Sequence, residues 1–545
     1  MDRREENGNI VQNQKEHVLA EDSSFDQQIK VQRLVNEAQR FREEISDKIK
    51  QNIEDSFDTF ISDIELINQS VQDENINVSF SRNRNNCCNM YKECSDYVKK
   101  KERGELPDKE FVARRSVLTD LFEISHIRSI YHVFVAILII FSINTILMDI
   151  VEKGSIGLEF GLLQWGLGKF PKVVSLWLWM QLSALIIVYP GFYGWTVYRP
   201  EGKVGVLDYI GLAVYILYQC LFMVIPIVYT FENQIPPGSA VIITCEQLRF
   251  MMKSHAFVRE NFPKVLAYSS KDSKDHDKAD MCPDFSKYLY FLFAPTLVYR
   301  DNYPRTATIR WGYVVSNFAQ VLACTLYIYY IFERFCITVF RNFNRDHVSA
   351  KLFITSVFSC MLPGALTLLL GFFAILHSWF NAFAEMLRFA DRMFYKDWWN
   401  TTSFASYYRT WNIVVHDWLY TYVYKDLSKL LGPKYRSICM ACVFLLSAIV
   451  HEYVMVMALG FFYPVLFVMF MGAGFGFIFV KGTGRSWNVF LWLALFMGMG
   501  VLFCVYNMEW FARQNCPENY DHFIDYVVPR SWTCNFDAMK NNSQS

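Results

Sequence analysis

The sequence is poor in charge and lacks the features of several common classes of protein. Charged residues make up 19% of its 545 residues, whereas 53% are hydrophobic and 17% are aromatic. A soluble protein of this length would carry more charge and would be divided into domains. The formal net charge is zero, which argues against a nucleic-acid-binding protein. The composition therefore favours a membrane protein with several spans.

Motifs for metals, phosphates and secretion are also missing. The fourteen cysteines include no CxxC pair or Cys–His cluster with zinc spacing, so we expect no metal and no bound cofactor. The run from Gly472 to Gly476 is apolar and lies within a predicted span, where small residues favour helix packing over phosphate binding. The first six residues, MDRREE, have no apolar core, and we expect no secretory signal peptide.

Residues 1–115 are polar and predict a solvent-exposed arm. Within this arm, from Phe25 to Leu66, apolar residues recur mostly every three or four positions, which is the period of an amphipathic helix. Such a stripe needs an apolar partner. The partner is either the protein's own membrane domain or a second copy of the chain, and the pattern leaves both alternatives open.

After the arm, long apolar runs alternate with polar segments. A helix needs roughly 20 apolar residues to cross a bilayer, and on this basis we count roughly nine spans. They cover residues 131–148, 173–197, 207–231, 240–252, 313–340, 352–383, 437–462, 463–480 and 487–506. The 240–252 run is short and holds Glu246 and Arg249, so it must be packed inside protein if it crosses. The apolar run 288–299 is shorter still and contains Pro295, which predicts a re-entrant or interfacial piece.

The predicted fold is therefore all-α, with three parts. An N-terminal arm covers residues 1–115, a polytopic membrane domain covers residues 116–510, and a tail covers residues 511–545. Arg114, Arg115 and Arg128 flank the first span, so the N-terminus is predicted to be cytosolic and, with an odd number of spans, the tail lumenal. The loop at 334–351 carries four Arg and Lys residues on the side where this rule expects few.

The two cysteines of the tail differ from the others. Cys516 and Cys534 bracket a polar segment after the last span, where the predicted topology provides an oxidising compartment. They form either a disulfide or two free thiols.

Polar side chains gather between residues 394 and 451, among apolar spans. Such groups are costly at membrane depth and usually line a site or a cavity. Ser447 and His451 lie four residues apart in one span, so they share a helix face, and Glu452 is adjacent. Histidine suits general-base chemistry near neutral pH, although a single histidine within a span is more often a packed residue.

The segment before this span predicts a helix from Tyr407 to about Asp426. Arg409, Asn412, His416 and Tyr420 recur at spacings of three and four, which places them on one polar face. The face belongs either to an interfacial amphipathic helix or to the wall of a tunnel. In a tunnel wall, the Asn412 amide can donate to a carbonyl oxygen. The cations Arg409, Lys425, Lys434 and Arg436 can bind a phosphate-bearing substrate.

The sequence resembles the sterol O-acyltransferases of the membrane-bound O-acyltransferase (MBOAT) family over most of the chain after about Ala113. One block that carries the resemblance is the motif FYxDWWN, formed by Phe394, Tyr395, Asp397, Trp398, Trp399 and Asn400. The other blocks are 407–412 (YYRTWN), 416–418 (HDW), 451–453 (HEY), 126–132, 288–301 and the tail 529–534 (PRSWTC). The first motif alone is similar in diacylglycerol acyltransferases, and the other blocks favour the sterol enzymes.

This resemblance implies an enzyme of the endoplasmic reticulum membrane that esterifies cholesterol with a long-chain acyl group from acyl-CoA. It implies that His451 is the catalytic histidine and Asn412 the essential asparagine. It implies that His126 lies near a sterol site, that Cys516 and Cys534 form a lumenal disulfide, and that the arm assembles dimers or tetramers. It also implies an acyl-CoA site, formed by Ser406, Arg409, Asn412, His416, Tyr424, Arg436 and Ser447. Arg436 stands where the family has lysine, and Ser406 where it has asparagine.

These residues allow direct transfer without an acyl-enzyme. His451 would accept the proton of the sterol hydroxyl, and Asn412 would stabilise the oxyanion. Ser447 has the spacing of a covalent nucleophile, but it shares a helix with His451, which gives poor geometry. The alternatives are a diacylglycerol O-acyltransferase, which differs in the acceptor, and a lipid transporter, which would consume no acyl-CoA. A repeat transporter would show matching broken segments in two halves, and the sequence has none.

Overall fold

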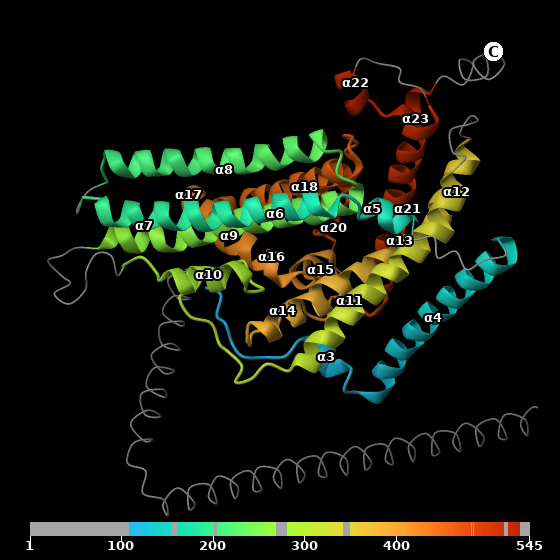
Figure 1. The fold of residues 1–545 in the computed structure, drawn as a ribbon, viewed down its shortest axis with the longest axis horizontal. Helices are drawn as coiled ribbons and strands as arrows, with labels where there is room; N and C mark the ends of the chain where they lie inside the picture. Colours follow the sequence, from blue (N-terminus) through green and yellow to red (C-terminus); the bar gives the residue numbers. More distant parts are fainter. Residues whose placement is uncertain are drawn as a thin grey trace, which may run out of the picture. The chain divides into compact units, whose positions relative to one another are not determined.

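The computed structural model describes residues 108–153, 161–200, 204–268, 281–341, 349–480, 482, 484–516 and 522–534. The chain divides into two units, Met1–Pro107 and Asp108–Ser545, and the described residues all belong to the second. The predicted amphipathic stripe from Phe25 to Leu66 lies outside them. Over the described residues the regular structure is helical, with two isolated β-bridges and no strand. The all-α prediction is confirmed (Figure 1).

Seven helical stretches among the described residues are long and apolar enough to cross a membrane. They are Ser125–Met148, Leu163–Tyr198, Val206–Glu232, Trp311–Phe340, Ala350–Met386, Pro433–Leu459 and Ser486–Asn515. Each contains or overlaps one of the predicted spans. The count of roughly nine is not confirmed, because two predicted spans have another form. Residues 240–252 belong to a longer helix with charged side chains, and residues 463–480 form the short apolar stretch Val465–Phe477.

Several membrane-length stretches are built from more than one helical element. The first half of the unit contains α3 (Val117–Leu121), α4 (Ser125–Lys153), α5 (Gly161–Gly166), α6 (Phe170–Ser183), η1 (Ala184–Val188), α7 (Tyr189–Tyr198), α8 (Val206–Glu232), α9 (Pro237–Ala267), α10 (Phe285–Phe293), α11 (Trp311–Ile331), η3 (Phe332–Ile337) and α12 (Thr338–Phe340). The elements η1 and η3 are π-helical turns inside continuous helices.

The second half contains the polar stretch and the last spans. Its elements are α13 (Ala350–Phe372), η4 (Phe373–Trp379), α14 (Phe380–Met386), η5 (Trp398–Asn400), α15 (Phe404–Thr410), α16 (Ile413–Trp418), η6 (Leu419–Tyr424), α17 (Lys425–Leu431), η7 (Pro433–Tyr435), α18 (Arg436–Leu459), α19 (Val465–Val468), η8 (Met469–Gly474), α20 (Phe475–Phe477), α21 (Ser486–Asn515), α22 (His522–Val527) and α23 (Arg530–Thr533).

The charged residues of α9 have hydrogen-bond partners inside the protein. The sequence predicted this packing for the 240–252 run if it crosses the membrane. Glu246 accepts hydrogen bonds from Arg249 and from the Trp177 indole, each at 2.7 Å. Lys253 is only 2% exposed, and its ammonium donates to the carbonyl oxygens of three residues in or just after α10, namely Phe291, Leu292 and Ala294. Each of these charged groups thus has a partner, which is the condition for burying it.

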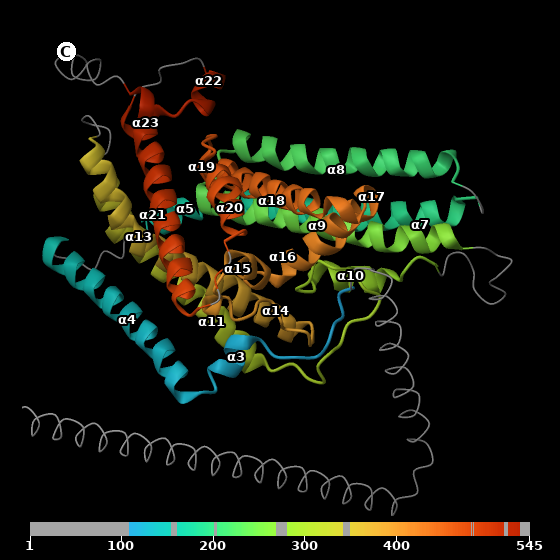
Figure 2. The same ribbon diagram turned by 180° about the vertical axis from the view of Figure 1, so that it is seen from behind.

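The helices of the membrane unit pack in two groups, which Figures 1 and 2 show from opposite sides. In one group, α9 packs against α6, α8 and α18, and in the other α13 packs against α21 and α11. The contact between α13 and α21 is close because small residues face the partner backbone. A Cβ at Gly364 would lie 3.0 Å from the Met499 carbonyl oxygen, and one at Gly500 only 2.9 Å from the Val357 carbonyl oxygen. Glycine therefore sets the spacing of these two helices.

The helix predicted from Tyr407 to about Asp426 is not continuous. α15 ends at Thr410, and Asn412, with φ −137° and ψ 90°, is the N-cap of α16. Two backbone hydrogen bonds from the preceding loop hold this break open: Lys396 N–H donates to the Thr410 oxygen, and Ile413 N–H donates to the Phe394 oxygen. The prediction was wrong here because tertiary contacts outweigh the periodic pattern.

Candidate active site

His451 lies near the middle of α18, and its imidazole is exposed at membrane depth. The Nδ1 atom lies 2.7 Å from the carbonyl oxygen of Ser447, one turn earlier. Because a carbonyl oxygen only accepts, Nδ1 must carry the proton. In the neutral ring, Nε2 then has the free electron pair. This tautomer is the one that a general base needs if its substrate lies on the Nε2 side.

One face of the His451 ring is covered by Phe470 from η8. The two rings are nearly parallel, with centroids 5.1 Å apart and an interplanar angle of 22°. The ring of Tyr408 on α15 also contacts Phe470, at 5.5 Å, and Phe444 on α18, at 5.2 Å. A row of aromatic rings thus connects α15 with the imidazole.

Glu452, next to the histidine, holds the segment that carries Phe470. Its side chain is buried, and one carboxyl oxygen accepts a 3.0 Å hydrogen bond from the Phe467 N–H. The Tyr506 hydroxyl donates to the same carboxyl group at 3.3 Å and accepts from the Leu466 N–H at 3.1 Å. These bonds satisfy N–H groups at the start of a helical segment, which lack partners within it. The position of Phe470 is therefore coupled to Glu452.

The FYxDWWN motif is mainly a structural anchor. Phe394, Tyr395 and Trp398 are at most 2% exposed, whereas Asp397 and Asn400 face outward. Trp398 packs edge-on against Trp411 with ring centroids 4.5 Å apart. The motif also supplies the backbone groups that hold the break before Asn412, so it positions the site through main-chain hydrogen bonds.

Asn412 has a role that the spacing of the polar face did not reveal. Its Oδ1 accepts a 3.2 Å hydrogen bond from the Val415 N–H and so caps α16. Because the capping atom accepts, it must be the oxygen, and this fixes the orientation of the amide. Within the described chain no hydrogen bond occupies Nδ2, which leaves a donor in a fixed position.

Beyond the break, two residues of the predicted polar face, His416 and Tyr420, form with Tyr424 a stack of rings that we call the aromatic ladder. The His416 and Tyr420 rings are parallel within 6° with centroids 6.3 Å apart, and Tyr420 and Tyr424 are parallel within 14° at 5.8 Å. Asp417 Oδ1 lies 3.5 Å from His416 Nδ1. Burial alone would raise the pKa of Asp417. The interactions with His416 and Lys109 lower it by more than burial raises it, so the pKa of Asp417 lies below its usual value.

The other predicted acyl-CoA residues lie at several places. Ser406 and Arg409 are on α15, where Arg409 is exposed and its Nε donates to the Ala405 oxygen. Arg436 is exposed at the start of α18, and Ser447 Oγ lies 3.5 Å from His451 Nδ1. Of the described residues, only Ser447 in this set contacts the histidine by a hydrogen bond.

His126, the predicted sterol residue, is exposed in the first turn of α4. In the described part of the chain, no hydrogen bond or ring contact joins it to His451. No group of three or more His, Cys, Asp or Glu side chains among these residues is arranged to hold a metal ion.

A buried polar cluster behind the motif was missed by the sequence analysis. The Tyr395 hydroxyl lies 2.7 Å from His377 Nδ1 and 2.7 Å from Ser116 Oγ. Asn381 donates to the His377 oxygen one turn earlier. Burial raises the pKa of Tyr395 above its ordinary value, so its phenol is neutral at physiological pH. Ser116 and His377 lie 261 residues apart in sequence, and no local pattern connects them.

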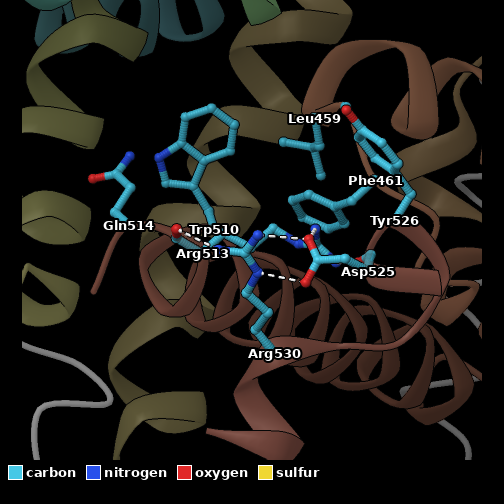
Figure 3. A pocket seen from close by; sticks show the side chains of 9 residues that line it. Leu459, Phe461, Trp510, Arg513, Gln514, Asp525, Tyr526 and Arg530 are labelled. Atoms are coloured by element: carbon cyan, nitrogen blue, oxygen red, sulfur yellow. Dashed lines mark hydrogen bonds and ion pairs between the residues drawn. The ribbon is translucent and has the colours of Figure 1, made fainter. Parts of the chain in front are cut away.

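A cavity of about 290 Å³ lies elsewhere, between the ends of α18 and α21 and the tail. Arg513 and Arg530 converge there on Asp525, as Figure 3 shows, with nitrogen–oxygen distances of 3.4 and 2.6 Å. Arg513 also pairs with Glu509 at 2.7 Å, so the charges balance. Leu459, which lines the cavity, is eight residues beyond His451, or about 12 Å along the helix. The cavity is therefore separate from the histidine.

The tail is closed by the predicted disulfide. Cys516 and Cys534 are bonded and enclose the segment that supplies Asp525 and Arg530. The prediction is confirmed, and the alternative of two free thiols is wrong.

Comparison with known proteins gives consistent results over most of the membrane unit. The family model described as MBOAT, membrane-bound O-acyltransferase family, matches residues 215–508. Sterol O-acyltransferase 1 of Mus musculus is 48% identical over 440 residues, which cover 80% of this chain and 80% of that protein. Sterol O-acyltransferase 2 of Homo sapiens is 44% identical over 429 residues, which cover 78% of this chain and 80% of that protein.

Proposed function

Because the chain belongs to the membrane-bound O-acyltransferase family, we propose that it transfers a long-chain fatty acyl group from acyl-CoA to the 3β-hydroxyl of cholesterol. The products are cholesteryl ester and free CoA. The observation that carries this proposal is the 48% identity over 80% of the chain to a protein named sterol O-acyltransferase 1. The polar stretch around His451 supplies groups suited to the chemistry.

In the proposed mechanism His451 is the general base. Nε2 accepts the proton of the sterol hydroxyl, while the Nδ1–H bond to the Ser447 carbonyl holds the ring in that tautomer. The sterol oxygen attacks the thioester carbonyl, and the proton on Nε2 then passes to the sulfur of the departing CoA. A thioester is already activated, so no acyl-enzyme is needed. The Ser447 hydroxyl lies 3.5 Å from Nδ1, the ring nitrogen that carries the proton, and not beside the free electron pair of Nε2, which favours a structural role for Ser447 over that of a nucleophile.

Asn412 is proposed to stabilise the oxyanion that forms on the thioester carbonyl. Its oxygen caps α16, and its Nδ2–H groups make no hydrogen bond to another described residue. A donor held in place before the reaction needs no reorganisation in the transition state. We assign Ser406, Arg409, His416, Tyr424, Arg436 and Ser447 to the acyl-CoA site and His126 to a sterol site.

We propose that the protein acts in the endoplasmic reticulum membrane, with its N-terminus cytosolic and its tail lumenal. The number of membrane-length helices among the described residues is odd, which supports opposite sides of the membrane for the two ends of the chain. The Cys516–Cys534 disulfide supports an oxidising compartment for the tail. We further propose that residues 1–115 form a cytosolic arm that mediates self-association as dimers or tetramers. The amphipathic stripe in the sequence supports this.

The test is transfer from labelled oleoyl-CoA in microsomes of cells that lack their own sterol esterification. Cholesterol and diacylglycerol are both offered, and wild type is compared with His451→Ala at equal protein level. We expect cholesteryl ester from wild type and none from the variant. Triacylglycerol in place of cholesteryl ester would make the protein a diacylglycerol acyltransferase. Lipid movement without acyl-CoA consumption would support a transporter, and a fully active variant would refute the mechanism.

A further inference from the structure

Residues 108–116, which precede the first span, lie along the helices of the membrane unit, and we call them the strap. Three contacts fix their course. Phe111 packs edge-on against Tyr303, with centroids 5.1 Å apart. Arg114 forms a two-point ion pair with the buried Asp391, at 2.7 and 3.0 Å, and this pairing raises the pKa of Arg114. Its main chain also bonds to residues 390 and 392.

The first two residues of the strap pair with residues that contact two members of the aromatic ladder, His416 and Tyr420. Lys109 pairs with Asp417 Oδ2 at 2.7 Å, and the side chains of this pair are only 16% and 19% exposed. The other oxygen of Asp417 faces His416 Nδ1 at 3.5 Å. Asp108 pairs with Lys425 at 2.7 Å. The Lys425 ammonium lies 5.2 Å from the centre of the Tyr420 ring.

We propose that Lys109 and Asp108 are positioning residues for acyl-CoA binding, acting through Asp417 and Lys425 on the His416–Tyr420–Tyr424 ladder. This inference rests on the proposed function, because it assumes that His416 and Tyr424 contact acyl-CoA. The strap itself need not touch the substrate.

The role of Lys109 depends on the geometry of one carboxylate. Asp417 has two oxygens, one directed to Lys109 and one to His416. Without Lys109, the imidazole is the one close ion-pair partner that remains to the carboxylate among the described residues, and the carboxylate must turn or draw in water, since a buried charge needs compensation. Either change moves the His416 ring, which is the first member of the ladder.

Asp108 acts through Lys425 on the middle ring of the ladder, Tyr420. Lys425 is 5% exposed and lies over the face of Tyr420, as a cation–π pair requires. Asp108 holds this ammonium from outside. Two consecutive residues of the strap thus support the first and the middle ring of the ladder, from about 300 residues away in sequence.

The experiment measures initial rates of cholesteryl ester formation in microsomes, with oleoyl-CoA and cholesterol varied in turn. The variants are Lys109→Ala, Lys109→Arg, Asp417→Asn and the double variant Lys109→Ala with Asp417→Asn. The matched control is Arg115→Ala, because Arg115 belongs to the same segment but pairs with Glu123 at an exposed site, where its side chain is 61% exposed. Thermal stability of each purified variant is recorded alongside.

We expect Lys109→Ala to raise the KM for oleoyl-CoA about fivefold or more, within the range for coupling through a side-chain network. The KM for cholesterol and kcat should stay within about twofold. Lys109→Arg should restore the KM, because it keeps the ion pair. The double variant should be no worse than Asp417→Asn, since two residues that act through one contact are not additive.

Four results would overturn the proposal: an unchanged KM for oleoyl-CoA, an equal rise in Arg115→Ala, additive effects in the double variant, or failure of Lys109→Ala to accumulate in the membrane. The last would show that Lys109 is needed for folding. A wild-type protein that forms no cholesteryl ester would instead refute the proposed function, so the two failures are distinguishable.

Discussion

Replacing Glu452 should test whether the position of Phe470 against the His451 ring affects the rate of acyl transfer. The Glu452 carboxyl group accepts from the Phe467 N–H and the Tyr506 hydroxyl. The segment that it holds carries Phe470, whose ring covers the imidazole. In Glu452→Leu the Phe467 N–H loses its acceptor. In Glu452→Gln the side-chain oxygen still accepts from the Phe467 N–H, and the Tyr506 hydroxyl can accept from the N–H of the new amide.

The magnitudes follow from these contacts. A buried N–H without a partner costs about 1–3 kcal/mol, so Glu452→Leu should lower the melting temperature by about 2–6 °C. If the start of α19 relaxes and Phe470 shifts by about 1 Å, kcat should fall roughly 10- to 100-fold, the usual cost of such a misplacement. Glu452→Gln keeps both hydrogen bonds and should remain within about threefold of wild type.

The assay is transfer from labelled oleoyl-CoA to cholesterol, normalised to the amount of protein, with melting measured in detergent. Glu232→Gln is the matched control, because Glu232 is exposed at the end of α8. A folded Glu452→Leu variant with wild-type kcat would refute the reasoning. If Glu452→Gln were as impaired as Glu452→Leu, the negative charge would be required, and hydrogen bonding alone would not explain the role of the residue.

Three further predictions use other contacts. Asn412→Asp keeps the cap but loses the donor, so kcat should fall about 10²- to 10³-fold in the transfer assay with an unchanged melting temperature. Asp417→Asn should lower the melting temperature near neutral pH, and this difference should disappear in acid. The pKa of Asp417 is lowered by folding, so its stabilisation exists above the unfolded value of about 3.9 and disappears as the pH falls through the folded one. Cys534→Ser should cost about 3 kcal/mol, the value for a closed loop of this length, as measured by detergent melting against Cys442→Ser.

The spans and the disulfide were predictable because their signals are local. A run of apolar residues predicts a helix in a bilayer whatever its neighbours are, and α4, α8 and α21 follow their sequence patterns closely. α9 was harder to predict, because its charged residues are compensated by partners such as Trp177 and the carbonyl groups at the end of α10.

The candidate site was predictable in its residue types but only partly in its geometry. The spacing of Arg409, Asn412 and His416 predicted one face of a continuous helix. In the structure the helix is broken at Asn412, and main-chain hydrogen bonds of Phe394 and Lys396 stabilise the break. The contacts of Ser116 with Tyr395 and of Lys109 with Asp417 span about 280 and 308 residues. Periodicity extends over single helices and carries no information about such pairs.

The buried ammonium of Lys253 bears on how the chain is made. Its three acceptors, in residues 291–294, are synthesised some 40 residues after the lysine itself. Until the ribosome has passed Ala294, the lysine has no final partner, and α9 cannot settle among its neighbours without an uncompensated charge. By contrast, α4 exposes apolar side chains along its length and can enter the bilayer as soon as it emerges. Insertion of this chain is therefore not a strict sequence of independent steps: α9 must wait for α10.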